Sequence, residues 1–157
     1  MDGEHDTTRI PPQPGVVSLA AAIIEHPTLG LLLQLRDEHA PNFPLHWSLF
    51  GGHMEADEDP DFALWRELDE ELQLTQQMVK SWRLAWNLPH HSGGRVYIYH
   101  VITEATLENL VLGEGKAMHF ANALDLDPPQ PYRGHYFTAY SSRVLRDYLS
   151  TQMNGQS

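Results

Sequence analysis

The chain has 157 residues, with no cysteine, 10 basic and 21 acidic side chains, and a net charge of −11 when histidines are neutral. This length suits one domain with a substantial core, and the lack of cysteine excludes a disulfide framework. The negative charge argues against binding to a nucleic acid polymer, and no apolar run could span a bilayer, so we expect a cytoplasmic protein without a membrane contact.

The first part of the chain predicts a flexible arm followed by two strands. Residues 1–14 are polar and rich in proline, which is typical of a segment that does not fold on its own. Residues 16–24 and 29–36 are apolar runs, and we expect them to form strands joined by a turn. Residues 37–46 contain two prolines and are expected to form a loop.

A helix is predicted to begin at Asp59-Pro60 and to run to about Leu72. Aspartate is a favoured N-cap, and proline suits the first helical position. At about 100° per residue, the helix has an apolar stripe and, next to it, an acidic face. The stripe consists of Leu64, Trp65, Leu68 and Leu72, and the acidic face consists of Glu67, Glu70 and Glu71. The helix can therefore bury one side and hold three carboxylates in a cleft.

Strands and a second helix are predicted in the rest of the chain. Residues 81–88 and 95–103 are expected to be strands around a hairpin loop that contains Gly93-Gly94. Residues 116–120 predict another short strand. Residues 136–149 carry apolar side chains at helical spacing, and residues 152–157 are expected to form a polar tail.

The dense carboxylates of the first helix need positively charged partners, because like charges side by side destabilise a fold. Hard oxygen ligands suit Mg²⁺, with Mn²⁺ as an alternative, and such ions bind through a few carboxylates together with substrate phosphates. The alternative is a solvated acidic face, but such a face would carry interspersed lysines. Arg66 is the only base in this run, so the pattern favours a metal site.

The spacing of these residues resembles the signature of the Nudix hydrolases, G-x5-E-x7-R-E-U-x-E-E-x-G-U, in which U is aliphatic. The chain follows it from Gly52 to Leu74 but has Gln73 in place of the last glycine. We expect this difference to change how the helix ends rather than to remove chemistry. The resemblance implies an α/β fold, namely an α/β/α sandwich with a mixed sheet between helices, over a single domain of residues 15–151.

The same resemblance implies roles for individual residues. The metal ligands would be Gly52, through its carbonyl, and Glu67, Glu70 and Glu71. Arg66 would pair with Glu58 and orient a catalytic carboxylate. Glu114, in a later loop, is a candidate base or ligand, although an ordinary turn acid is the alternative. Either Glu70 or Glu114 would be the general base, and the sequence does not choose between them.

The implied activity is metal-dependent hydrolysis of a diphosphate linkage in a nucleoside diphosphate joined to another group, X. The substrate would be a small nucleotide, such as an NTP, a dNTP or an NDP-sugar. A catalytically silent nucleotide-binding or regulatory module is the alternative, although the intact carboxylates speak against it. An isoprenyl diphosphate isomerase, a type of enzyme that resembles the same fold, is a third possibility. That enzyme type uses a cysteine, and this chain has none. Because many members are dimers, a homodimer is a further expectation.

Candidate substrate contacts outside the signature are Arg36, Trp82 and Arg95. A guanidinium can bind phosphate, and an indole can stack on a base, although a surface charge and core packing are the respective alternatives. Trp82 and Trp86 lie four residues apart, so in a regular strand they would share a face. His90-His91 is expected to be a solvated loop in which the two rings point apart.

Overall fold

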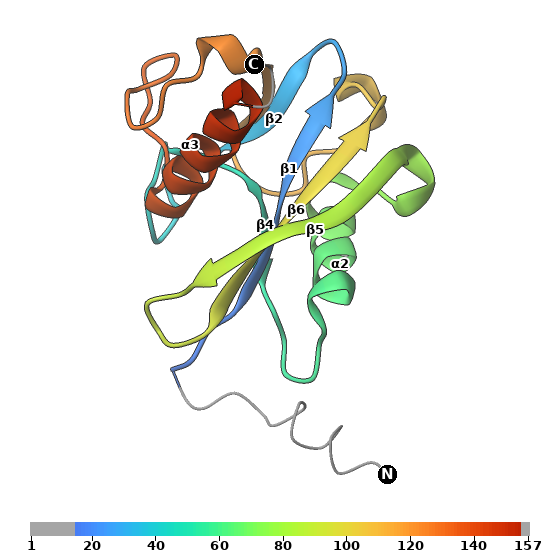
Figure 1. Ribbon diagram of the computed structural model, residues 1–157, viewed down its shortest axis with the longest axis vertical. Coiled ribbons are helices and arrows are strands. Elements are labelled where there is room, and N and C mark those ends of the chain that lie inside the picture. Colours follow the sequence, from blue (N-terminus) through green and yellow to red (C-terminus); the bar gives the residue numbers. More distant parts are fainter. Residues whose placement is uncertain (1–14, 155–157) are drawn as a thin grey trace.

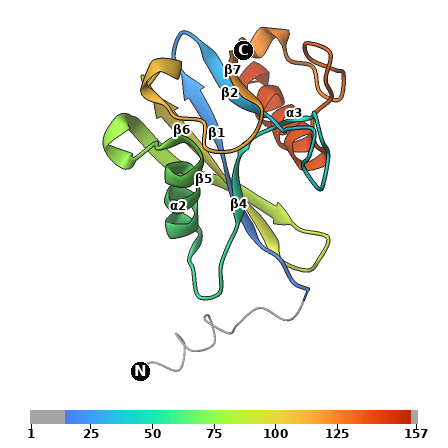
Figure 2. The same cartoon turned by 180° about the vertical axis from the view of Figure 1, so that it is seen from behind.

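The computed structural model describes residues 15–154, so the expected arm of residues 1–14 and the final residues 155–157 lie outside the description. Its centre is a seven-stranded mixed sheet. Helix α2 (Pro60–Leu72) covers one face of the sheet and helix α3 (Ala139–Asn154) covers the other (Figures 1 and 2). This arrangement confirms the predicted α/β/α sandwich. Within residues 15–154, no helix combines the length and hydropathy needed to cross a bilayer.

The sheet is built around its first strand. The strands are β1 (Leu19–His26), β2 (Gly30–Leu35), β3 (Trp47–Ser48), β4 (Phe50–His53), β5 (Val79–Pro89), β6 (Arg95–Thr103) and β7 (Ala117–Ala121). Their order is β3-β2-β1-β6-β5, with β4 also paired to β1 and β7 to β2. Strand β1 pairs with β6 in parallel and with β2 and β4 in antiparallel orientation. Short 3₁₀ turns lie at Gln76–Met78, Leu107–Asn109 and Ala123–Asp125.

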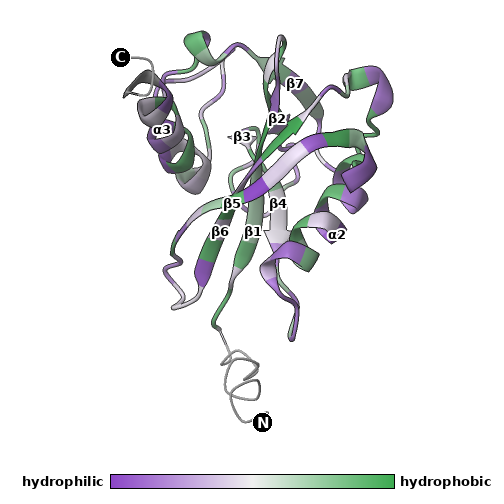
Figure 3. Ribbon diagram, turned by 45° about the vertical axis from the view of Figure 1, so that its right-hand side comes forward, coloured by the Kyte–Doolittle hydropathy of each residue, from purple (hydrophilic) through white to green (hydrophobic). Residues whose placement is uncertain are grey.

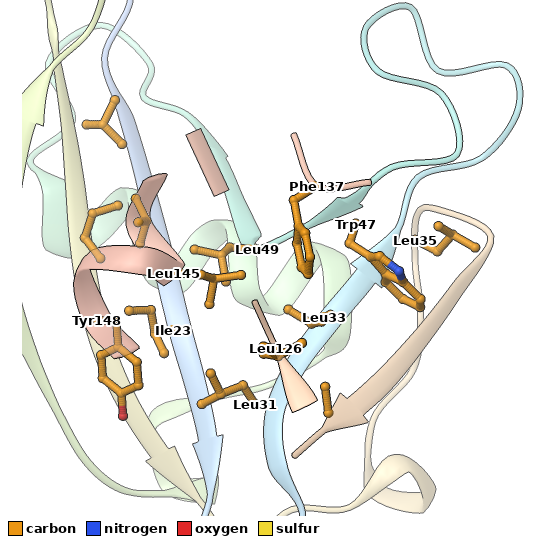
Figure 4. Close-up of a cluster of buried hydrophobic side chains, with 14 of the residues drawn as sticks. Ile23, Leu31, Leu33, Leu35, Trp47, Leu49, Leu126, Phe137, Leu145 and Tyr148 are labelled. Atoms are coloured by element: carbon orange, nitrogen blue, oxygen red, sulfur yellow. The ribbon is translucent and has the colours of Figure 1, made fainter. Parts of the chain in front are cut away.

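Alternation along β1 separates two apolar cores. Ala20, Ala22 and Ile24 are buried against the cluster that contains α2, whereas Ile23 belongs to the cluster that contains α3. Successive side chains of a strand point to opposite faces, so one strand supports both layers. Figure 4 shows Tyr148 of α3 beside Ile23, and Figure 3 shows the largely hydrophobic strands between the two helices.

Helix α2 matches its prediction at both ends. Asp59 is the N-cap and its side chain accepts a hydrogen bond from the Phe62 N–H at 2.9 Å. At the other end, Gln73 adopts the left-handed conformation (φ 54°, ψ 34°) that a glycine would take. The Gln73 N–H binds the Asp69 carbonyl at 2.9 Å, which is the hydrogen bond of an αL C-cap motif, and the Leu74 N–H binds the Leu68 carbonyl at 3.2 Å. The expectation that Gln73 alters the helix end is therefore wrong, and the substitution costs about 1 kcal/mol of backbone strain.

Other boundaries differ from the predictions. The first strand runs from Leu19 to His26, whereas residues 16–24 were predicted. The short strands β3 and β4 were not predicted. The second helix begins at Ala139, because Tyr136 is held in an extended segment by the Trp47 N–H, which binds its carbonyl at 2.8 Å. The same helix extends through residues 152–154, which were expected to belong to the tail.

The two tryptophans of β5 do not share a face. The pairing register between β5 and β6 shifts between Leu84 and Trp86, which marks a β-bulge. A bulge adds one residue and reverses the side-chain alternation beyond it. Trp82 therefore packs with the α2 cluster and Trp86 with the α3 cluster, and the predicted common face is wrong.

Candidate active site

Two glycines of β4 bring the backbone close to the acidic face of α2. Gly51 has φ +149°, and a Cβ there would lie 2.3 Å from the Ala20 carbonyl oxygen. A Cβ on Gly52 would lie 2.6 Å from the carboxyl carbon of Glu67. Only glycine allows such an approach, so the Glu67 carboxylate rests directly against the backbone of Gly52.

Glu71 is the buried acid of this site, with a relative exposure of 6%. Its Oε1 accepts a hydrogen bond from the Gly51 N–H at 3.0 Å. Burial raises the pKa of Glu71 to about 8, and the nearby charge of Glu67 adds to this rise. Burial also raises the pKa of Glu67, although the Arg66 guanidinium opposes it. Two carboxylates held in this way attract a cation.

Arg66 ties the helix to the loop before it. Its Nη2 donates to Glu58 Oε1 at 2.9 Å and to the His53 carbonyl at 3.1 Å. The Glu58 side chain is only 7% exposed, and the Arg66 guanidinium lowers the pKa of that carboxyl. Arg66 Nη1 also donates to Glu67 Oε1 at 3.0 Å. The structure therefore contains the expected Glu58–Arg66 pair, and the pair orients Glu67.

Glu114 is brought to the same place by a loop that caps the end of α2. The Gly113 N–H binds the Glu71 carbonyl at 2.8 Å, and the Val111 N–H binds the Leu72 carbonyl at 3.0 Å. These contacts satisfy carbonyls that a helix end leaves free. On the other side, the buried Gln34 donates its side-chain N–H to the Glu114 carbonyl at 2.8 Å.

These residues line one cleft of about 360 Å³, which we call the acidic cleft. The lining comprises Gln34, Arg36, Asp37, His39, Ala40, Pro41, Ser48, Leu49, Gly51, Gly52, Glu67, Glu71, Glu114 and Gly115. The predicted residues Gly52, Glu67, Glu71, Glu114 and Arg36 thus meet. Within residues 15–154, however, no three His, Asp or Glu side chains are close enough to form a ready metal-binding group.

Glu70 lies at the edge of this arrangement. It is absent from the cleft lining, its side chain is 58% exposed, and its Oε1 lies 3.4 Å from Arg66 Nη1. Glu70 nevertheless makes a small contribution, through its charge, to the raised pKa of Glu71.

A second cavity of about 560 Å³, which we call the aromatic cavity, adjoins the acidic cleft. The two share Arg36, Ser48, Leu49, Gly51 and Gly52. His90, His91 and Tyr140 line it, together with Phe43 and His53. The His90 and His91 ring centroids are 4.2 Å apart, and the Tyr140 ring stacks on His90 with a centroid distance of 5.3 Å and an angle of 12°. The expectation that the two histidines point apart is therefore wrong.

Two of the predicted substrate contacts lie elsewhere. Arg95 is exposed at the start of β6, where its Nε donates to Asn87 Oδ1 at 2.9 Å. Trp82 lines a different cleft, on the other side of α2. Among the three predicted contacts, only Arg36 reaches the acidic cleft, and its Nε donates to the Asn42 carbonyl at 2.9 Å.

The sequence analysis did not identify Gln34 or Tyr140. Gln34 is a polar residue in an otherwise apolar strand and is 5% exposed, and a buried amide of this kind indicates a specific partner. That pattern was the available signal. Tyr140 had no comparable signal, because it lies among other apolar residues of the predicted helix.

Replacing Gly52 with alanine is expected to lower kcat by about tenfold or more with a small change in stability. The new Cβ would meet only the end of the flexible Glu67 side chain, so the carboxylate moves and the backbone does not. Urea unfolding and initial rates on the same sample would measure both. Gly51→Ala is the matched control, because its Cβ would meet backbone atoms of β1 and should destabilise the fold. An active Gly52→Ala enzyme would show that the position of Glu67 does not matter.

Comparisons with known proteins agree on the family. A family model described as NUDIX domain matches residues 17–141. No curated protein matches the chain. Three similar solved structures have TM-scores of 0.68, 0.62 and 0.59.

The first of these structures is DR0079 from Deinococcus radiodurans, at 16% identity, with 86% of this chain and 86% of that chain covered. The second is MutT from work on Aliivibrio salmonicida and Vibrio cholerae, at 20% identity, with 86% and 98% covered. The third is a C. elegans Ap4A hydrolase, at 20% identity, with 87% and 98% covered. At these identities, the likeness establishes the shared fold.

Proposed function

The chain belongs to the NUDIX domain family, and from this premise we propose that it hydrolyses a diphosphate linkage in a nucleoside diphosphate joined to a group X, with a divalent cation in the acidic cleft. As a family member it is a Nudix-type pyrophosphohydrolase. One observation carries the proposal of this substrate and this cation. Glu67, Glu71 and Glu114 converge on a cleft that opens into an aromatic cavity large enough for part of a nucleotide.

The donors of the cleft fit Mg²⁺ or Mn²⁺. They are carboxylate oxygens and a backbone carbonyl, which are the ligands that these hard cations prefer. Glu67, Glu71 and the Gly52 carbonyl would hold the ion, and Glu70 would join them from the edge. The raised pKa of Glu71, caused by burial and by Glu67, supports a site that gains stability from a cation. When bound, such an ion neutralises diphosphate oxygens and makes water a better nucleophile.

The chain's own residues then position the reaction. We assign Glu114 as the general base, because it lines the cleft and is held by Gln34 and by the end of α2. Arg66 and Glu58 are positioning residues that fix Glu67. Arg36 lines both cavities, so its guanidinium is placed to bind the diphosphate between them.

The aromatic cavity would hold the base or the group X. Tyr140 and His90 line this cavity with aromatic rings, and stacking of a base on an aromatic ring is worth about 1–3 kcal/mol. Burial lowers the pKa of His90, with smaller contributions from His91 and His53. A neutral imidazole at pH 7 favours stacking over ion pairing.

Tyr140→Ala is therefore expected to raise KM for a nucleotide substrate by about tenfold while kcat changes little. The ring is lost from the cavity, whereas the acidic cleft is untouched. Steady-state kinetics would measure both constants, and Tyr136→Ala is a suitable control because Tyr136 is 58% exposed and does not line the cavity. If KM is the same in both variants, the base binds elsewhere.

A substrate panel tests the proposed activity. Phosphate and pyrophosphate release would be measured for NTPs, dNTPs, oxidised dNTPs, NDP-sugars and dinucleoside polyphosphates, with Mg²⁺, with Mn²⁺ and with EDTA. The structural similarity to an Ap4A hydrolase supports including the last class. Metal-dependent turnover of one class is the expected result. If no substrate turns over but nucleotides bind tightly in the presence of metal, the chain is instead a silent binding module.

A further inference from the structure

A further cleft, separate from the acidic cleft and from the aromatic cavity, lies between α2 and strand β5, on the side of the helix that faces away from the acidic cleft. Its volume is about 830 Å³. It is lined by Asp59, Pro60, Asp61, Phe62, Trp65, Arg66, Gln76, Trp82, Leu84 and Tyr99. None of these residues lines the acidic cleft, so the proposed hydrolysis does not account for it. In Figure 1 strand β5 crosses in front of α2, and in Figure 2 the order is reversed.

The walls of this cleft are aromatic. The Trp65 and Trp82 rings meet edge to face, with centroids 5.4 Å apart and an angle of 84°, and Tyr99 lies 6.1 Å from Trp82. Phe62 is 63% exposed and Leu84 is 44% exposed. Perpendicular indoles beside an exposed phenyl ring form a corner of π-faces, and such faces attract cations.

Two carboxylates at the rim have unused acceptor oxygens. Asp61 Oδ1 accepts from the Tyr99 hydroxyl at 2.5 Å, and Asp59 Oδ1 accepts from the Phe62 N–H at 2.9 Å. Within residues 15–154, no donor binds the second oxygen of either group. The only cation in the lining is Arg66, and its guanidinium already binds Glu58 and Glu67. The net charge of −11 also favours a positively charged ligand.

The open edge of the sheet borders the same cleft. Strand β5 ends the strand order and, within the described residues, pairs only with β6. Register shifts on both sides leave a regular stretch over residues 81–84. Trp82 and Leu84 belong to this stretch and line the cleft. An exposed edge of this kind can take an added strand, whose side chains then enter neighbouring pockets.

We propose that this cleft binds an arginine side chain presented by an extended peptide segment of a partner protein, which pairs with residues 81–84 at the edge of β5. A guanidinium stacks on an indole and donates to carboxylates at the same time, which suits both the rings and the free oxygens of Asp59 and Asp61. The exposed Phe62 and Leu84 extend the apolar surface beyond the reach of one guanidinium, and this favours a peptide over a free cation.

The test uses the full ¹⁵N-labelled chain and the peptide acetyl-Thr-Val-Arg-Val-Thr-amide, with a matched peptide that carries citrulline in place of arginine. The indole N–H signals of Trp65 and Trp82 are expected to shift with the arginine peptide, with about tenfold weaker binding of the citrulline peptide. The Trp47 indole, which donates to the Tyr132 carbonyl, is an internal reference and should stay in place.

Asp61→Asn is expected to weaken binding of the arginine peptide by about tenfold, while the amide oxygen of the new side chain still accepts from the Tyr99 hydroxyl. Asp69→Asn is the matched control: it removes one charge from an exposed position of the same helix that does not line the cleft. Hydrolysis rates should be unchanged in both variants.

Three results would overturn the proposal: equal binding of the two peptides, indole signals that stay in place at millimolar peptide, or equal weakening by the two substitutions. If N-acetylarginine amide bound as tightly as the peptide, the strand pairing with β5 would be wrong.

Discussion

Glu71→Gln is expected to lower kcat by about two to three orders of magnitude, the scale at which a lost charge in a preorganised site acts, without loss of the fold. Glu71 is buried and lies beside Glu67, and both burial and that neighbour raise its pKa to about 8. At neutral pH such a carboxyl must either take up a proton on folding or hold a buried charge, and both destabilise the metal-free protein. Glutamine removes the charge, and its amide oxygen can still accept from the Gly51 N–H. The metal-free variant should therefore unfold at a urea concentration equal to or higher than that of the wild type.

The two effects are measured on one preparation. Urea unfolding in EDTA gives the stability, and turnover of the best panel substrate with Mg²⁺ gives the activity. Glu108→Gln serves as the control, because Glu108 is exposed in the turn at Leu107–Asn109, and both quantities should stay near wild-type values. A Glu71→Gln enzyme with wild-type turnover would remove this face of α2 from the proposed metal site.

The part of the fold that the sequence predicted well is the part specified by neighbouring residues. Helix α2 begins and ends where predicted, because Asp59 caps it and Pro60 suits its first turn. Strand β6 also has its predicted bounds. In both cases the signal lies within the element itself, as apolar spacing flanked by residues that stop or start it.

The errors concern features that depend on distant partners. The bulge that separates Trp82 from Trp86 exists because β5 pairs with β6, and strand periodicity alone assumes an unbroken alternation. The His90 and His91 rings are gathered beside Tyr140, about 50 residues away in sequence. No local pattern of residues in the hairpin loop contains that information.

The candidate site shows the same division. The acidic face of α2 was predicted from the spacing of its carboxylates and Gly52 from the family resemblance, and the structure places Gly52 against Glu67. The support of the Glu114 loop was not predicted, because it comes from Gln34 on β2 and from the last turn of α2. Spacing within a motif can thus indicate which side chains come together, whereas the residues that support them depend on the assembled fold.

Glu114→Gln is expected to lower kcat by about two orders of magnitude or more, which is the contribution of a general base. Glu114 and Glu70 were equal candidates for this role on sequence grounds. The structure separates them, since Glu114 lines the cleft with Glu67 and Glu71, whereas the Glu70 side chain is 58% exposed and lies beside Arg66. We therefore expect Glu70 to act as a peripheral metal ligand and Glu114 to act on the water.

The dependence of the rate on Mg²⁺ concentration distinguishes these roles. A lost ligand weakens metal binding, so Glu70→Gln should regain most of its activity as Mg²⁺ is raised. A lost base leaves metal binding nearly intact, so Glu114→Gln should stay slow at saturating Mg²⁺ because no other group takes the proton from water. The control is Glu38→Gln, since Glu38 is an exposed acid bound to Lys116 and is absent from the cleft lining. Recovery of Glu114→Gln at high Mg²⁺ would instead make Glu114 a ligand and return the base to Glu70.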